Sequence, residues 1–451
     1  MEISELYKIF VNHPVVTTDS RDCPAGSIFF ALKGASFNGN KFAAAALDKG
    51  CAYAVVDEAD YATDPRCLLV DNCLATLQQL AHYHRRQLGT RIIGITGTNG
   101  KTTTKELTAA VLKERFNVLY TQGNFNNDIG VPKTLLRLRP EHDIAVVEMG
   151  ASHPGDIKTL VDIVEPDYAI ITNVGRAHLQ GFGSFEGVVR TKGELYDFMR
   201  TLMAGGIAEP QRTAPIEPHC VFIDNDNEHL RGIAHDLPLV SYGTKASDTL
   251  SVEGSVVSQD PMLTFRWRKQ QQGVAGSWHE VRTHLIGAYN IANMLAAATI
   301  GTYFGVAESQ IVDALEGYEP SNNRSQLEVT AHNRLIVDAY NANPTSMAIA
   351  ISNFSEMHAD NKMAILGSMK ELGSVSRAEH EKIIELLRHS DIHTVWLVGE
   401  EFEECEVPAG FRLFDNVEQV KTAIDRQQPQ GYYILIKGSN STKLFQLPEK
   451  L

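Results

Sequence analysis

The chain has 451 residues, of which 43% are hydrophobic and 21% charged, and its formal net charge is −14 at pH 7. A single hydrophobic core rarely serves so long a chain, because domains average roughly 100–200 residues, so we expect three domains. The acidic balance excludes a protein that binds nucleic acid through a basic face, although a few local donors can still hold a nucleotide substrate.

The cysteines and the start of the chain predict a cytoplasmic protein. Six cysteines occur without a CxxC pair or metal-ligand spacing, which is typical of reduced thiols. The first residues lack the basic and apolar regions of a signal peptide. No apolar run approaches the roughly 18–20 residues needed to cross a bilayer, so we expect no membrane insertion.

Residues 1–88 predict a small α/β domain. Short apolar strands alternate there with helical stretches, which is the rhythm of an α/β fold. The expected strands are Ser27–Leu32, Ala52–Val56 and Cys67–Val70, and the expected helices are Phe42–Lys49 and Ala75–Gln87.

Residues 89–319 predict a central domain built on a parallel, doubly wound sheet. From Arg91 onward, apolar strands alternate with helical segments. The stretch Leu250–Ile286 alternates without a helical period, which predicts antiparallel strands at the edge of this sheet. Further expected strands are Asn117–Tyr120, Asp143–Glu148 and Tyr168–Thr172, and the expected closing helices are Tyr289–Phe304 and Glu308–Tyr318.

Residues 320–451 predict a third domain. The segment Glu319–Asn323 contains Pro, Ser and Asn and predicts a linker. After it the alternation of strands and helices resumes, so the whole chain is expected to be α/β with three domains. The expected strands are Leu335–Ala339, Met363–Leu366, Thr394–Val398 and Tyr433–Lys437.

The strongest local signal is a glycine-bearing loop between a strand and a helix. The apolar strand Ile92–Ile95 runs into Thr96-Gly97-Thr98-Asn99-Gly100-Lys101-Thr102-Thr103-Thr104, and a helix is expected at Lys105–Arg115. The general pattern G-x4-G-K-[ST] would need a glycine at position 95, whereas Gly94 stands one place early. The segment therefore predicts a shortened phosphate-binding loop, with an accidental glycine-rich turn as the alternative.

The residue types in this loop suit a triphosphate. Gly97 and Gly100 let successive backbone N–H groups turn toward the phosphates, and the helix N-terminus adds partial positive charge. Lys101 can reach the β and γ phosphates, and the Thr102 hydroxyl can coordinate Mg²⁺.

Three further polar residues follow, of which two lie at strand ends that fit the same crevice. Glu148 ends a strand near the loop, where a Mg²⁺ ligand belongs in an α/β sheet, although many strands end in an acid. His178 follows the next strand, but a lone histidine is more often structural. Lys192 lies in the helical stretch Ser184–Met199, and a solvated helix face is the simple explanation for it.

The ordered motifs resemble the Mur ligases and their folylpolyglutamate synthase relatives. The matching segments, in the family's order, are GTNGKT, EMG, the strand end with His178, the helix with Lys192, G-x-x-N-x-x-N, a linker arginine and DAYNANP. The resemblance implies a small UDP-binding domain, a central P-loop ATPase domain and a C-terminal Rossmann-like domain that carries the second substrate and closes on ATP.

The resemblance also implies roles for individual residues. Lys101, Lys192, His178 and Arg324 would be catalytic, and Lys192 would be carbamoylated, which turns a cation into an anion with two oxygens. Metal ligands, for two Mg²⁺ ions, would be Thr102, Glu148, His178 and Lys192. ATP would contact Gly97, Thr98, Asn99, Gly100, Lys101, Thr102, Thr103, Asn290, Asn293, Arg324 and Asp338, and the other substrates would contact Ser20, Arg21, Asn124, Asn127, Asn341 and Asn343.

Two positions in the third predicted domain depart from the family's pattern. An aspartate is usual where Ser368 stands, and an arginine is frequent where Asn440 stands. A missing carboxylate at the first position puts any metal or charge role there in doubt.

The implied activity is ATP-dependent ligation of D-alanyl-D-alanine to the terminal carboxylate of UDP-N-acetylmuramoyl-tripeptide through an acyl phosphate. This would be the last cytoplasmic step toward the UDP-linked pentapeptide, carried out by a monomer. The alternatives are a single-amino-acid-adding Mur ligase, a folylpolyglutamate synthase and, from another class, a non-catalytic nucleotide-binding protein.

Overall fold

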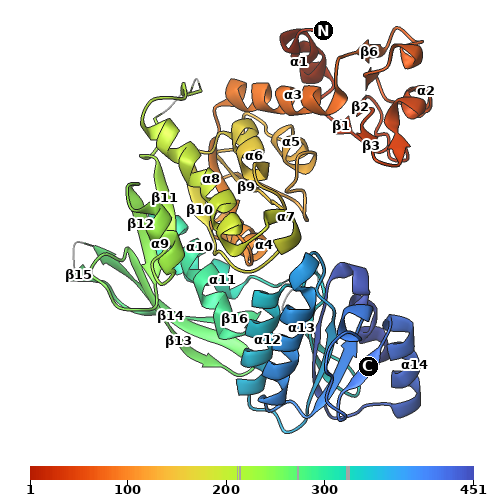
Figure 1. The fold of residues 1–451 in the computed structure, drawn as a ribbon. Helices are drawn as coiled ribbons and strands as arrows, with labels where there is room; N and C mark the ends of the chain where they lie inside the picture. Colours follow the sequence, from red (N-terminus) through yellow and green to blue (C-terminus); the bar gives the residue numbers. More distant parts are fainter. Residues whose placement is uncertain (211, 213–214, 272–273, 321–325) are drawn as a thin grey trace.

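A computed structural model describes residues 1–210, 212, 215–271, 274–320 and 326–451. The described strands form a four-stranded, a ten-stranded and a six-stranded sheet, together with a short hairpin. The N-terminal and C-terminal regions each lie beside the central one (Figure 1). Each large sheet falls inside one of the three predicted residue ranges, whose boundaries remain predictions.

The first sheet is parallel throughout. Its strands, in spatial order, are β1 (Val16–Thr17), β2 (Ile28–Phe30), β5 (Tyr53–Val56) and β6 (Cys67–Leu69). The hairpin is formed by β3 (Lys33–Gly34) and β4 (Phe37–Asn38), and the helices are α1 (Ile3–Asn12), α2 (Ala43–Asp48) and α3 (Cys73–Leu88).

The central sheet is parallel from β8 to β13 and antiparallel at the far edge, as the sequence predicts. In spatial order the strands are β15 (Val274–Ala275), β14 (Met262–Gln271), β13 (Val252–Gln259), β12 (Leu239–Gly243), β11 (Cys220–Asp224), β10 (Tyr168–Ile171), β7 (Arg91–Thr96), β9 (Ile144–Glu148) and β8 (Val118–Tyr120), while β16 (His279–Ile286) pairs with β14. The helices are α4 (Lys101–Lys113), α5 (Gly130–Leu135), α6 (Asp156–Val164), α7 (Leu179–Phe182), α8 (Phe185–Met203), α9 (Glu228–Ala234), α10 (Ile291–Tyr303) and α11 (Glu308–Glu316).

The third sheet is parallel except for one antiparallel edge strand. Its strands, in spatial order, are β17 (Gln326–Val329), β18 (Arg334–Asp338), β22 (Tyr433–Lys437), β19 (Lys362–Gly367), β20 (Thr394–Val398) and β21 (Arg412–Phe414). The helices are α12 (Pro344–Glu356), α13 (Ser376–Arg388) and α14 (Val417–Gln427).

The central sheet is covered on both faces, which explains its continuous apolar strands. In β7, Ile92 belongs to one buried cluster, whereas Ile93 and Ile95 belong to another on the opposite face. Helices α3, α5, α6 and α8 pack into the first cluster, and α4, α10 and α11 pack into the second. This is the doubly wound arrangement that the sequence predicts.

Two local predictions need correction. The helix after the glycine loop begins at Lys101 rather than at Lys105, because burial of Thr102 and Thr104 outweighs the low helix propensity of a threonine run. Strands β11 and β12 were not predicted, although the run Cys220–Asp224 is apolar and short enough for a strand. In the part of the chain that the structure describes, no helix is both long and apolar enough to cross a membrane.

A buried arginine ties the first region to the central sheet. Arg85 of α3 has a fully buried side chain and donates to the carbonyls of Val164 and Glu165, at 3.1 and 2.8 Å. It also pairs with the buried carboxylate of Asp167, at 3.1 Å, which in turn accepts from the N–H of Ile92 in β7. The two regions are therefore joined by hydrogen bonds as well as apolar contacts.

We expect Arg85→Met to lower the free energy of unfolding by about 3 kcal/mol, because it leaves a buried carboxylate and two carbonyls without this partner. A urea titration measures the effect. Arg86→Met is the control: its partly exposed pair with Glu165 is expected to contribute about 1 kcal/mol or less. Equal losses in the two variants would contradict the account.

Candidate functional site

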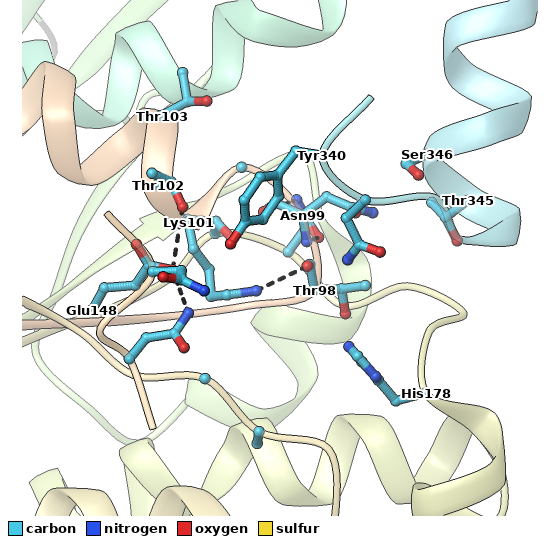
Figure 2. Close-up of a pocket in the computed structure, with 18 of the residues that line it drawn as sticks. Thr98, Asn99, Lys101, Thr102, Thr103, Glu148, His178, Tyr340, Thr345 and Ser346 are labelled. Carbon is cyan, nitrogen blue, oxygen red and sulfur yellow. Dashed lines mark hydrogen bonds between the residues drawn. The ribbon is translucent and has the colours of Figure 1, made fainter. Parts of the chain in front are cut away.

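The carboxyl ends of β7, β9 and β10 meet at one edge of the central sheet and open into a cleft of about 990 Å³. The third sheet's domain closes the other side of this cleft with Asp338, Tyr340 and Asn341. Ligands in open α/β sheets bind at such an edge. Figure 2 shows the side chains that gather there.

The loop after β7 requires glycine at two positions. Gly97 has φ +145°, and a Cβ there would lie 2.0 Å from the Thr172 hydroxyl. Gly100 has φ +75°, and a Cβ there would lie 2.5 Å from the Asn293 amide oxygen. At both positions the backbone conformation disfavours any residue with a side chain, and a neighbouring atom occupies the space that a Cβ would need. The loop is therefore tightly enclosed.

Asn173, at the end of β10, holds the loop in place. It accepts from the N–H of Asn99 through its side chain, at 3.0 Å, and from the N–H of Thr98 through its carbonyl, at 2.9 Å. Because these two N–H groups are engaged, the donors best placed for a phosphate are those of the first turn of α4, which have no partner within the helix. Asn173 was not among the predicted site residues, although its place directly after an apolar strand was a usable signal.

The Lys101 ammonium group lies over the loop. Its Nζ donates to the carbonyls of Gly97 and Thr98, at 2.9 and 3.0 Å (Figure 2). The positive charge therefore lies at the N-terminus of α4, where the helix dipole already favours an anion.

Glu148 is a buried carboxylate with one engaged and one orphaned oxygen. Its Oε1 accepts from the Thr102 hydroxyl at 3.3 Å and from the Asn126 amide at 2.8 Å (Figure 2). Its Oε2 has no hydrogen-bond partner in the described structure, and the buried Lys105 ammonium lies 3.8 Å away. An orphaned, buried carboxylate oxygen beside a hydroxyl fits a divalent cation such as Mg²⁺.

His178 lies in the same cleft, as expected. Its backbone is left-handed, with φ +50°, and its Nδ1 contacts the carboxylate of Glu371 from the third domain. Burial lowers the pKa of His178, as do the charges of Lys101 and Lys192, while Glu371 opposes them. These effects favour a neutral imidazole, the form that coordinates metals.

Lys192 is buried, so the alternative of a solvated helix face is wrong. It lies on the buried face of α8. Its Nζ is 3.5 Å from the Ala151 carbonyl and 5.5 Å from the centre of the Phe182 ring. Burial, and then the charge of Lys101, hold the pKa of Lys192 well below its usual range. A depressed pKa favours the neutral form of the amine, which is a nucleophile.

The expected adenine contacts lie at the start of α10. Asn293 donates to Asn290 at 2.9 Å and accepts from Thr104 at 3.0 Å, while Asn290 donates to the Ile286 carbonyl at 2.9 Å. Both asparagines line the cleft, and Asn293 links this part of it to helix α4.

The third domain contributes an ion pair and a direct contact with the loop. Asp338 accepts from Lys437 at 2.5 Å, and Lys437 also lies 3.4 Å from the Asn341 carbonyl. Asn343 caps α12 and donates to the Asn99 side chain at 2.8 Å. Asn343 therefore contacts the phosphate loop itself, which sequence reasoning did not anticipate.

The loop around Asn124 faces the cleft, whereas Ser20 and Arg21 do not line it. The Asn127 side chain accepts from the N–H of Gly130, the first residue of α5, at 2.8 Å. Arg21 is exposed and pairs with Asp19 at 2.8 Å in the first region. Arg324 lies outside the described residues.

Most predicted residues are brought together. Those that line the cleft are Thr98, Asn99, Gly100, Lys101, Thr102, Thr103, Asn124, Asn127, Glu148, His178, Asn290, Asn293, Asp338 and Asn341. Gly97, Lys192 and Asn343 do not line it but contact residues that do, namely Lys101, Ala151 and Asn99. The roles of all these residues remain predictions.

Ser368 carries no carboxylate, but an acid lies near it. The Ser368 hydroxyl is buried and faces Gly399, and a Cβ at Gly399 would lie 3.4 Å from the Glu401 carboxylate. Glu401 in turn pairs with Lys370. A negative charge is therefore present in this part of the third domain.

Comparison with known proteins gives one consistent result along the chain. Residues 14–86 match the model of the "Mur ligase family, catalytic domain", residues 95–301 the "Mur ligase middle domain", and residues 323–440 the "Mur ligase, glutamate ligase domain". The UDP-N-acetylmuramoyl-tripeptide–D-alanyl-D-alanine ligase of Escherichia coli is 34% identical over 98% of this chain and 94% of its own length.

Solved structures agree with the sequence comparison. A MurF crystal structure from Acinetobacter baumannii has a TM-score of 0.81 and 29% identity, and covers 97% of this chain and 92% of the other. A MurF ligase from Thermotoga maritima in complex with ADP also has a TM-score of 0.81, at 24% identity, and covers 97% of this chain and 96% of the other.

We expect Gly97→Ala to abolish measurable ATP binding, because the added Cβ would overlap the Thr172 hydroxyl and displace the loop. Isothermal titration of the folded variant with ATP measures the effect. Gly123→Ala is the matched control: its φ is also positive, at +51°, but a Cβ there meets nothing within 4 Å. Wild-type affinity in the Gly97 variant would contradict the assignment of the loop.

Proposed function

The chain belongs to the Mur ligase family, and we propose that it joins D-alanyl-D-alanine to the terminal carboxylate of UDP-N-acetylmuramoyl-tripeptide with ATP as the energy source. The observation that carries the proposal is the cleft: the phosphate loop, Glu148 and the third domain's Asp338 and Asn341 all face one cavity. A ligase needs this convergence, since nucleotide, acceptor and donor must meet in one place.

In the first step the substrate carboxylate attacks the γ-phosphorus, and the bond from that phosphorus to ADP breaks. Lys101 and the first-turn N–H groups of α4 neutralise the negative charge that develops on the phosphoryl oxygens and on ADP. The product is an acyl phosphate, in which the carboxyl carbon is activated.

In the second step the amine of D-alanyl-D-alanine attacks that carbon. The tetrahedral oxyanion collapses with loss of phosphate, and the amine's surplus protons pass to solvent or to phosphate. Water would hydrolyse the acyl phosphate, so the third domain must cover the cleft during the reaction. The hydrogen bond from Asn343 to Asn99 is a contact that could hold it there.

Thr102, Glu148 and His178 would hold divalent cations. When bound, Mg²⁺ would supply positive charge to the phosphate oxygens and so favour their transfer. The orphaned Oε2 of Glu148 and the depressed pKa of His178 support this assignment.

We assign Lys192 as the carbamoylated residue. The neutral amine adds to CO₂, forming a nitrogen–carbon bond and releasing one proton. The resulting carbamate would offset the positive charge of Lys101 and offer two oxygens toward the metal site.

The proposed domain roles follow the chain. Residues 1–88 would bind the UDP end of the acceptor, with Ser20 and Arg21; Arg21 is free to turn to a diphosphate because its ion pair is exposed and weak. Residues 89–319 would bind ATP, and residues 320–451 the dipeptide, with Asn341 and Asn343. Arg324 would act on the nucleotide from the linker.

We place the enzyme in the cytoplasm as a monomer. All six cysteines are unpaired in the structure, which suits a reducing compartment.

We expect ADP release only when UDP-N-acetylmuramoyl-tripeptide and D-alanyl-D-alanine are both present, and its abolition by Lys101→Ala with the fold intact. A coupled ADP assay measures the rate. Lys113→Ala, an exposed lysine on the same helix, is the control and should keep wild-type turnover. Turnover with single amino acids instead of the dipeptide would favour the other Mur ligases, and near-normal turnover of Lys101→Ala would defeat the scheme.

We also expect activity to depend on CO₂. Because the pKa of Lys192 is depressed, a larger share of its amine is neutral than in an ordinary lysine and can be carbamoylated, whereas acidification protonates it and releases CO₂. Isotopically labelled bicarbonate should give one carbamate NMR signal, which Lys192→Ala removes and Lys158→Ala, an exposed lysine whose pKa is raised by Asp162, leaves unchanged. A bicarbonate-independent rate with no carbamate signal would contradict this assignment.

A further inference from the structure

Glu371 of the third domain contacts the predicted metal site of the central domain. It follows β19 in the chain, and its carboxylate meets Nδ1 of His178, the residue that precedes α7. The contact continues in the backbone, because the N–H of Gln180 donates to the Glu371 carbonyl at 3.0 Å. Both Glu371 and His178 line the cleft.

The two partners share an unusual backbone conformation. His178 has φ +50° and Glu371 has φ +62°, and neither is a glycine. Left-handed backbone is disfavoured for residues with a side chain, and it persists where surrounding structure holds it, most often at functional sites. Two such residues face each other across the domain interface, which makes a chance surface contact a poor explanation.

Stability does not account for the pair either. The Glu371 side chain is 58% exposed and that of His178 33% exposed, and ion pairs so open to water contribute little. What the contact does determine is the state of the imidazole ring. When Nδ1–H donates to a carboxylate, the proton is fixed on Nδ1 and the lone pair of Nε2 is left for a metal.

We propose that Glu371 is a positioning residue that fixes the ring orientation and tautomer of His178, so that docking of the third domain completes the metal site of the central domain. The inference rests on the proposed function, which assigns His178 as a metal ligand. It adds that the site is shared: one domain supplies the ligand, and the other supplies the group that orients it.

Neighbouring charges leave Glu371 available for this role. Lys370, the adjacent cation, pairs with Glu401 and not with Glu371. A second ion pair spans the same interface, between Arg176 and Glu379 at 3.2 Å, with the Arg176 N–H donating to Thr345 at 2.9 Å. The Arg176 contacts therefore support docking of the third domain without involving His178. Their contribution can be separated from that of the Glu371–His178 contact by mutating each pair.

The test combines Glu371→Ala with two readouts: the His178 tautomer by histidine nitrogen NMR, assigned with His178→Gln, and Mn²⁺ affinity of the full chain without substrates. The spectra are taken at about pH 8, above the ordinary histidine pKa. We expect the wild type to carry the proton on Nδ1. Glu371→Ala should shift it toward Nε2 and weaken Mn²⁺ binding about tenfold, as removal of an outer-shell partner does.

Two further variants make the result specific. Glu371→Gln keeps an oxygen acceptor and should retain most of the wild-type tautomer and Mn²⁺ affinity. Glu379→Gln breaks the other interface pair and should leave the His178 tautomer unchanged. An unchanged tautomer in Glu371→Ala, or an equal change in Glu379→Gln, would overturn the proposal. Since neither readout needs turnover, failure of ligase activity alone would count against the proposed function and not against this inference.

Discussion

The hydrogen bonds around Asn99 join the parts of the molecule that meet at the cleft. Its backbone N–H donates to Asn173 at the end of β10, and its side chain accepts from Asn343 of the third domain. One residue of the phosphate loop is thus held by the central sheet on one side and by a helix cap of another domain on the other. The position of the loop and the docking of the third domain are coupled through it.

The phosphate loop carries a local positive charge although the chain as a whole is acidic. The protein as a whole carries a formal charge of −14, yet the Lys101 ammonium lies over the phosphate loop and the Lys105 ammonium lies 3.8 Å from the buried carboxylate of Glu148. Local cations at a helix N-terminus can hold a polyphosphate despite a negative total, because the surrounding low-dielectric protein strengthens short-range interactions more than distant ones. Burial of the Lys192 amine disfavours its charge and holds its pKa well below the usual range.

The sequence predicts those features that depend on neighbours in the chain. An apolar strand followed by Gly97, Gly100, Lys101 and Thr102 indicates a phosphate loop because strand, turn and helix are all local. The burial of Lys192 was missed, since the helix pattern shows spacing but not what packs against it. Asn173, Asn343 and Glu371 act across elements distant in sequence, and only the folded chain places them beside the loop and His178. The start of α4 was misplaced because tertiary packing overrode the low helix propensity of the threonines.

The central claim is that the cleft activates a carboxyl group by phosphorylating it, and the fate of the carboxylate oxygens tests this most directly. UDP-N-acetylmuramoyl-tripeptide labelled with heavy oxygen in its terminal carboxylate would be converted with ATP and D-alanyl-D-alanine, and the released inorganic phosphate examined by mass spectrometry. An acyl phosphate intermediate transfers one labelled oxygen to each phosphate. Unlabelled phosphate, with the amide product formed, would contradict the account.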